Sequence, residues 1–246
     1  TRDIVQHLEQ SDDIEYLNNE LDNVDEALKI IMRFERAPIM MSSDYDYILM
    51  LASKGAKLSG SEIYETERLF LTIKANKKLL NALLNEKVSC HNYERIINEI
   101  DIIDYLDQII IKSIDESGEV LDNASPTLKQ IRNKLQGIDQ RIKTRCQEIL
   151  VKESSKLAQS SIVMRNDCYC LAVKAEYKNM VKGTIQDYSS SMQTVYIEPY
   201  EVQELMREKM ELYHQEHDEI EKILKEISSY INKEVERLKL YFEKVV

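Results

Sequence analysis

Residues 161–199 have the pattern of short β-strands and lie between two long stretches that have the pattern of helices. Side chains at 168–175 alternate between two faces, as strand residues do: Tyr169, Leu171, Val173 and Ala175 on one, and Cys168, Cys170, Ala172 and Lys174 on the other. Val181, Ile185, Val195 and Ile197 extend this pattern, and residues of turn type separate the runs. We expect three or four short antiparallel strands.

The two flanking stretches predict long helices. The first opens with Ser125-Pro126, a cap followed by proline in the first turn, and would be about 48 Å long if it ran from 126 to 157. Its apolar residues recur at spacings of three and four: Leu128, Ile131, Leu135, Ile138, Ile142, Cys146 and Ile149. The second restarts after Glu198-Pro199 and approaches a heptad repeat. Two such helices around a compact β segment most simply pair antiparallel.

The first 125 residues predict a helical bundle with an acidic surface. We expect four helices there, opening at Ser11-Asp12-Asp13 and ending at Ala37-Pro38, then over 44–53, from near Ser59, and over 91–112. In the first helix, apolar residues also recur at three and four: Ile14, Leu17, Leu21, Val24, Leu28 and Ile31.

The predicted fold is therefore mainly α, and glycine and proline are scarce, with five and three residues. We expect a helical bundle core over 1–125, an ascending helix over 126–160, a β segment over 161–198 and a returning helix over 199–246. The two helices form a long antiparallel, coiled-coil-like arm with the small antiparallel β segment at its tip.

Charge is unevenly distributed along the chain. The net charge is −11, yet residues 126–182 hold 12 bases and 5 acids, a local charge of +7. Five bases spaced 7, 4, 7 and 4 form one narrow stripe on the first arm helix: Lys134, Arg141, Arg145, Lys152 and Lys156. Such a stripe can follow a phosphate backbone. Alternatively, its members pair as coiled-coil flank residues with Glu204, Glu208 and Glu211.

Further polar side chains surround the turns of the β segment: Arg165, Asn166, Lys174, Lys178, Asn179 and Lys182, with Tyr177 and Tyr188 nearby. These side chains suit contacts to a nucleic-acid backbone, which position a protein without reading sequence. The alternative is an ordinary solvated hairpin.

No catalytic, cofactor or metal site is predicted. His214 and His217 are three residues apart near Glu211 and Glu221, which suits a solvated helix face better than a metal site or a metal-dependent enzyme. The Cys168-x-Cys170 pair is interpreted as packing. GAKLSGSE (55–62) has the glycine spacing of a phosphate loop but lacks the Lys-Ser/Thr that follows it.

The cellular location is predicted from three features that the sequence does not have. Its four cysteines have no disulfide-framework spacing, no apolar run approaches the roughly 20 residues of a membrane span, and the first residues do not resemble a signal peptide. We expect a cytoplasmic protein. Because the chain starts at Thr1 and stops at Val246 within a helical pattern, we also expect a fragment of a longer protein.

Four segments together resemble the MutS-II branch of the MutS superfamily: VDEALKII (24–31), SGEVLDNASPTLKQIRNKL (117–135), IVMRNDCYCLAVKAEYK (162–178) and GTIQDYSSSMQTVYIEP (183–199). The resemblance implies a homodimeric ATPase and endonuclease with a helical core, lever, clamp, nucleotide-binding domain and C-terminal Smr domain. It also implies a role in suppressing homologous recombination through branched or mismatched DNA, or in rescuing stalled ribosomes through rRNA. By position this chain matches the core (1–125), the lever (126–160 and 199–246) and the clamp (161–198), so the resemblance implies that ATP and magnesium belong to the missing ATPase domain.

In the segments that match the family's clamp, the resemblance implies that the nucleic-acid-binding residues are Arg165, Asn166, Lys174, Tyr177 and Lys178. The family pattern usually has a basic residue at Cys168, proline at Ala172 and Gly-Ala at Met192-Gln193. We therefore expect a clamp and lever module that holds nucleic acid by its phosphates. The competing hypothesis is a structural coiled coil that contacts only protein, including its own copy.

Overall fold

A computed structural model describes residues 12–34, 37–42 and 44–246. Packing divides the chain into two compact units, one of residues 125–221 and the other of residues up to 124 together with 222–246. Helices predominate, and the strands form one small antiparallel sheet, which confirms the mainly-α fold class. Within the described ranges, no helix is both long and apolar enough to span a membrane.

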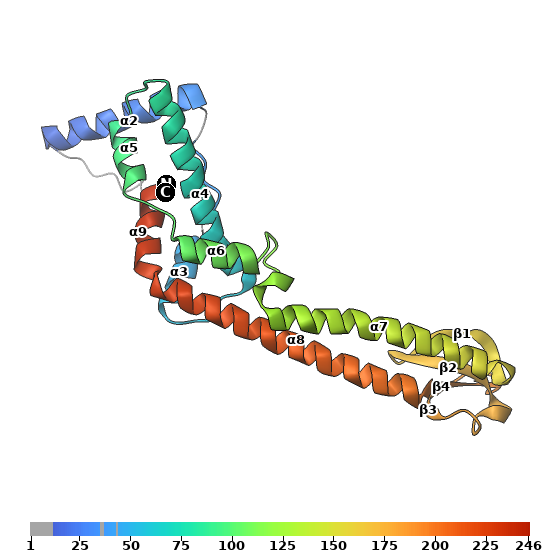
Figure 1. The fold of residues 1–246 in the computed structure, drawn as a ribbon. Helices are drawn as coiled ribbons and strands as arrows, with labels where there is room; N and C mark the ends of the chain where they lie inside the picture. The colour runs from blue at the N-terminus through green and yellow to red at the C-terminus, as the bar shows by residue number, and fades with distance from the viewer. Residues whose placement is uncertain (1–11, 35–36, 43) are drawn as a thin grey trace. The chain divides into compact units, whose positions relative to one another are not determined.

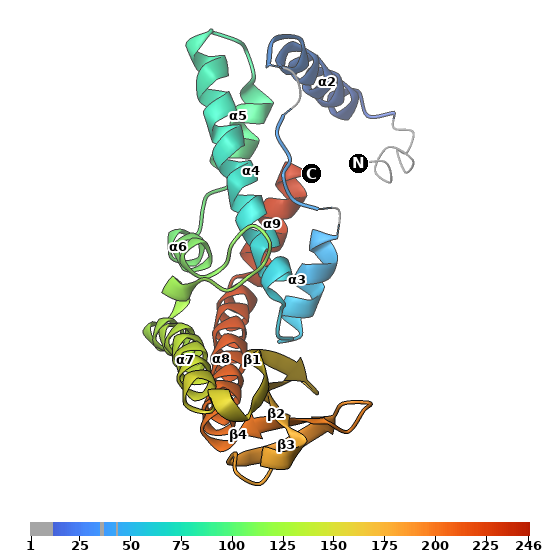
Figure 2. The same cartoon turned by 90° about the vertical axis from the view of Figure 1, so that its right-hand side faces the viewer.

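The unit of residues 125–221 is built on α7 (Pro126–Lys152) and the first part of α8 (Tyr200–Lys233), which run side by side in Figures 1 and 2. The Ser125 hydroxyl accepts a hydrogen bond from the Leu128 amide at 2.9 Å, so the predicted cap is formed. The apolar stripe of α7 is buried: Leu128, Ile131, Leu135, Ile138, Ile142, Cys146 and Ile149. The predicted antiparallel arm is confirmed.

Four strands form the sheet of this unit, and their order across it is β1-β2-β4-β3. Their bounds are β1 (Leu157–Arg165), β2 (Cys168–Lys174), β3 (Gly183–Tyr188) and β4 (Thr194–Pro199). All neighbouring strands are antiparallel, as predicted. Leu171, Val173, Val195 and Ile197 bury one face of the sheet in a core shared with α7.

The junction between α7 and the sheet differs from the prediction. The helix ends at Lys152 instead of 157, a 3-10 turn follows over Ser154–Lys156, and β1 starts four residues before 161. The Lys156 amide donates to the Glu153 carbonyl at 2.8 Å, which closes this turn. Leu157, the first residue of β1, is buried in the shared core, and residues 153–156 contain no Gly or Pro that would have indicated the helix end.

The other unit consists of helices α2 (Ile14–Phe34), α3 (Tyr45–Ser53), α4 (Gly60–Asn85), α5 (His91–Asn98), α6 (Asp104–Ser113) and α9 (Val235–Val245), a short 3-10 helix η1 (Asp122–Ala124) and the end of α8. The Asp13 carboxylate caps α2 by accepting from the Glu15 amide at 2.9 Å; the predicted cap residue Ser11 lies outside the described residues. Ser59 and Glu62 form a capping box at the start of α4, as their spacing predicts.

The prediction of a single helix over 91–112 is wrong, because the structure has two helices, α5 and α6, with an irregular link between them. Ile100 and Ile103 in the link are buried, so the apolar periodicity continues although the helix does not. The Asp101 carboxylate accepts from the Ile102 amide at 2.8 Å, a local bond that competes with helix formation.

The returning helix predicted over 199–246 is interrupted at Glu234, so that α8 ends at Lys233 and α9 begins at Val235. Residues from Lys222 onward pack with the helical unit of residues up to 124. Ile231, Val235 and Leu238 are buried there, and their regular spacing crosses the interruption.

Candidate functional site

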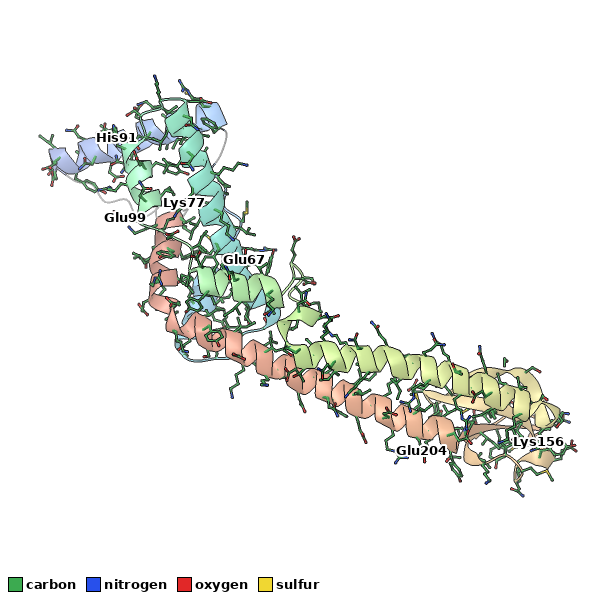
Figure 3. All side chains as sticks on the ribbon, in the orientation of Figure 1. Glu67, Lys77, His91, Glu99, Lys156 and Glu204 are labelled. Carbon is green, nitrogen blue, oxygen red and sulfur yellow. The ribbon has the colours of Figure 1, made fainter. Side chains whose placement is uncertain are left out.

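Ion pairs join α7 to α8 along the predicted basic stripe. The Arg141 guanidinium lies 2.9 and 3.1 Å from the two carboxylate oxygens of Glu208, and Arg145 lies 2.5 Å from Glu201. These two cations therefore behave as coiled-coil flank residues. Among the described residues, Glu204 and Glu211 form no ion pair with the stripe; Glu204 projects from α8 in Figure 3.

Two further pairs between the helices were not predicted. Arg132 Nε lies 2.7 Å from Glu216, and Lys209 Nζ lies 2.7 Å from Asp139. From one pair to the next, the residue number rises along α7 and falls along α8, as the antiparallel register of the two helices requires. The spacing of these residues was visible in the sequence, but the register that pairs them was not.

The other three stripe residues differ from one another. Lys156 lies beyond α7, at the sheet end of the unit (Figure 3), and its amine is 2.5 Å from Glu153. Lys134 and Lys152 are exposed, and in the part of the chain that the structure describes neither has a carboxylate at ion-pair distance. The stripe is thus partly neutralised, and Lys134 and Lys152 keep a free positive charge.

In the clamp, Arg165 and Asn166 are held against the sheet. The Arg165 guanidinium carbon lies 4.5 Å from the ring centroid of Tyr196, a cation–π geometry, and Asp187 lies 3.7 Å away. Asn166 and Asp167 both have positive φ, as the tight turn between β1 and β2 requires, and the Asn166 amide donates to the Gln186 carbonyl at 3.0 Å. Tyr196 was not predicted as a partner; strand alternation from Val195 could have placed it opposite the core face.

The remaining clamp residues follow β2. The Lys174 amine donates to the Ser155 carbonyl at 3.3 Å and lies 6.0 Å from the Tyr177 ring centroid. Lys178 and Asn179 are exposed, and their side chains have no hydrogen-bond or ion-pair partner among the residues described. These two side chains are available to a ligand.

Lys152 of the stripe and Lys182 of the clamp line one hollow of about 230 Å³, beside Tyr200 at the start of α8. Two acids also line it, but Glu153 is paired with Lys156 and Glu201 with Arg145, each at 2.5 Å. Lys182, like Lys152, is exposed and has no carboxylate partner in the described ranges. One residue from each predicted set thus lines this hollow, which lies at the start of α8, the positive end of its dipole, and at the end of α7, the negative end of its dipole.

A second hollow of about 650 Å³ lies between the two arm helices. Gly137, Gln140 and Thr144 of α7 and Leu205 of α8 line it together with the paired residues Arg141 and Arg145. Because its cations already have acid partners, this hollow is less suited to an anion than the one at Lys152.

Cys168 and Cys170 lie on the face of β2 that is turned away from the shared core. Burial raises the pKa of the Cys170 thiol to about 11, and burial also raises the pKa of Cys168. Protonated thiols are poor nucleophiles and poor metal ligands. His214 and His217 are both exposed on α8, and in the described residues no group of three or more His, Cys, Asp or Glu side chains is arranged to hold a metal ion.

Comparison with known proteins finds relatives whose names include MutS2. The chain is 35% identical over 207 residues to the Endonuclease MutS2 of Listeria monocytogenes serotype 4a (strain HCC23), an alignment that covers 83% of this chain and 26% of that protein. It is 32% identical over 226 residues to the Putative endonuclease MutS2 of Bacillus subtilis (strain 168), covering 91% and 29%. The chain spans about a quarter of the length of these curated relatives. No protein-family model matches it.

Proposed function

Since this chain is a MutS-like segment, similar over most of its length to MutS2 proteins, we propose that it is the lever and clamp with which a MutS-like protein engages nucleic acid. Its ligand is branched or mismatched DNA, or the rRNA of stalled ribosomes, held through phosphates and without sequence readout. The endonuclease activity in the relatives' names, and any ATP- and magnesium-dependent step, we assign to other parts of the intact cytoplasmic, homodimeric protein.

The observation that carries this proposal is the hollow at Lys152 and Lys182. Two lysines without carboxylate partners among the described residues line it, although the chain as a whole has a net charge of −11. The acids beside them are held by Lys156 and Arg145, so they do not neutralise the two amines. An anion the size of a phosphate group would gain favourable electrostatic energy at this place without losing an existing ion pair.

A gel-shift series with four-way-junction DNA at several salt concentrations tests the proposal. We expect Lys152→Glu/Lys182→Glu to weaken binding and to flatten the salt dependence by roughly two phosphate contacts. Lys78→Glu/Lys112→Glu, which reverses two exposed lysines in α4 and α6, is the matched control for the change in net charge. Unchanged affinity and slope in the double variant would contradict the assignment.

The second candidate function is a structural coiled coil that contacts only protein. It is favoured by the pairing of Arg141 with Glu208 and of Arg145 with Glu201, which removes two cations from the stripe. The same gel-shift series separates the two functions, because a module that contacts only protein binds junction DNA no better than a protein of equal charge.

A further inference from the structure

A further basic hollow, of about 240 Å³, lies in the helical unit between the loop after α3 and the last turns of α8. Its lining includes Lys57 of the loop and Lys225, Ser229 and Lys233 of α8, and none of the described residues that line it is acidic. This lining contrasts with the rest of the unit, since residues up to 124 hold 13 bases and 25 acids. The loop belongs to GAKLSGSE (55–62), the segment without the Lys-Ser/Thr of a phosphate loop, and α8 brings lysines to it from elsewhere in the chain.

Two hydrogen bonds fix the loop on α8, and in Figure 1 the loop passes beside that helix. The Leu58 amide donates to the Ser228 hydroxyl at 2.9 Å, and both residues are buried. The Asn232 side-chain amide donates to the Ala52 carbonyl at the end of α3. Because the two walls of the hollow are bonded to each other, the hollow is preformed, and a ligand would bind with little ordering of the backbone.

The amines of Lys225 and Lys233 are available to a ligand. Both lysines are exposed, and among the described residues neither has a carboxylate at ion-pair distance. Lys233 Nζ lies 5.2 Å from the ring centroid of Tyr230, a contact that leaves its positive charge in place. Glu226, the acid next to Lys225 in the sequence, accepts a hydrogen bond from the Tyr230 hydroxyl at 2.9 Å instead.

The negative groups at the helix ends beside the hollow already have partners. Both α3 and α8 end there, and the C-terminal end of a helix is the negative end of its dipole. The Ala52 carbonyl accepts from the Gly55 amide at 2.9 Å, and the Ile231 carbonyl accepts from the Glu234 amide at 3.1 Å. The Glu234 carboxylate lies 3.0 Å from Arg237. The lysines therefore determine the sign of the charge at the hollow.

The spacing of the lysines indicates an extended anion. Lys225, Ser229 and Lys233 follow one another at steps of four on one side of α8, so the two lysines are about 12 Å apart along the helix axis. A chain of two or three phosphate groups can meet an amine at each end and the Ser229 hydroxyl between them. The hollow is smaller than the roughly 300–1,000 Å³ of pockets for drug-sized ligands, and none of its described lining residues is aromatic, so a nucleobase would have no ring to stack on.

We propose that this hollow binds a small anion that carries two or three linked phosphate groups, held by Lys225, Ser229 and Lys233. Lys57 adds positive charge from the side of the loop. The proposal is independent of nucleic-acid binding by the arm, because this hollow and the hollow at Lys152 belong to different units.

Isothermal titration calorimetry with inorganic triphosphate, in a metal-free buffer of low salt, tests the proposal. Every chain in the series carries Lys152→Glu/Lys182→Glu, so that the hollow at Lys152 contributes no heat and its own role does not affect the result. We expect binding at one site.

Substitution of the two α8 lysines identifies that site. Lys225→Ala/Lys233→Ala should weaken binding by roughly tenfold or more, with an unchanged thermal unfolding midpoint, because both side chains are exposed. Lys78→Ala/Lys112→Ala, which removes two exposed lysines elsewhere in the same unit, is the matched control and should bind as the parent does. Absence of binding, or equal losses in the two double variants, would overturn the proposal.

Ser229 tests where the ligand lies. Ser229→Glu places a carboxylate between the two lysines and should abolish binding, whereas Ser229→Ala removes one neutral hydrogen-bond donor and should cost only roughly threefold in affinity. Unchanged binding by Ser229→Glu would overturn the placement of the anion along this row.

Other anions, titrated in place of inorganic triphosphate, identify the part of the ligand that is recognised. Inorganic phosphate should bind more weakly than triphosphate, because it cannot meet both lysines at their spacing. Adenosine triphosphate should bind no more tightly than triphosphate, because the hollow offers nothing to the base. Equal affinity for phosphate, or tighter binding of adenosine triphosphate, would overturn the assignment to a chain of phosphate groups alone.

Discussion

The carboxylates of Glu67 and Asp107 share one cation: Lys74 Nζ lies 2.6 Å from Asp107 and 3.6 Å from Glu67. Glu67 projects from α4 (Figure 3) and is only 2% exposed, and among the described residues its second oxygen has no hydrogen-bond donor. Burial, and then the charge of Asp107, raises the pKa of Glu67 to about 7. One buried acid in the helical unit therefore titrates near neutral pH.

We predict that this acid makes stability fall as pH rises towards 7. The folded protein keeps a proton on Glu67 that the unfolded chain releases at its ordinary pKa of 4.5, so the stabilising contribution is complete below pH 4.5 and is lost as pH rises through about 7. Glu67→Gln should remove this dependence and should be more stable than the parent above pH 7 by roughly 1–3 kcal/mol, the cost of a buried unsatisfied charged oxygen. Urea unfolding at several pH values measures it, with exposed Glu119→Gln as the control. A parent whose pH profile matches that of Glu67→Gln would contradict the pKa assignment.

Substitution by alanine should lower the stability of the protein at Gly118 and raise it at Gly137. Gly118 has a φ of +87°, and a Cβ there would lie 2.5 Å from the Ser61 amide nitrogen, so Gly118→Ala should destabilise the helical unit by roughly 1–3 kcal/mol. Gly137 lies inside α7 with open space around its Cα, so Gly137→Ala should stabilise the arm by roughly 0.5–1 kcal/mol. Calorimetry of the two variants checks both signs; destabilisation by Gly137→Ala would mean that the arm helix is strained there.

Much of this architecture follows from local patterns, and the exceptions have physical causes. The caps at Ser59 and Ser125 are predictable because a side chain bonds to an amide three residues away in the sequence. Apolar periodicity locates buried residues but not helix ends, so the break at Asp101 was missed. The close approach of Gly118 to Gly60, and the pairing of Arg132 with Glu216, depend on residues far apart in sequence. Single-sequence patterns carry no information on such contacts.

Within the candidate site, the spacing of the charged residues could be predicted from the sequence. Which of them are neutralised by ion pairs could not. Arg141 and Lys152 belong to the same predicted stripe, yet only Arg141 meets a glutamate of α8. That difference depends on the antiparallel register and on where α7 ends. Lys152 and Lys182 line one hollow because α7 ends at Lys152, beside the segment that leads into β3.

We predict that packing, and not ion pairing, holds the arm together. Ile142 is 2% exposed in the shared core, so Ile142→Ala should cost about 2–4 kcal/mol. The Arg141–Glu208 pair is exposed on both sides, so the coupling energy in a double-mutant cycle with alanine should be only about 0.2–1 kcal/mol. Denaturant unfolding of these variants compares the two terms. A coupling energy that matches the loss in Ile142→Ala would reverse this order.

The clamp residues that the family resemblance implies can be tested separately from the hollow at Lys152 and Lys182. Lys178 is exposed and free of a carboxylate partner in the described chain, and Arg165 and Lys174 rest on tyrosine rings of the same sheet unit. If the clamp closes on phosphates, the triple variant Arg165→Glu/Lys174→Glu/Lys178→Glu should bind four-way-junction DNA at least tenfold more weakly at low salt, because each reversed charge repels the backbone. Arg165→Lys/Lys174→Arg/Lys178→Arg keeps the charges and is the matched control, and circular dichroism checks that the sheet is intact. Equal binding by the reversed and charge-conserving variants would remove these three residues from the proposed interface.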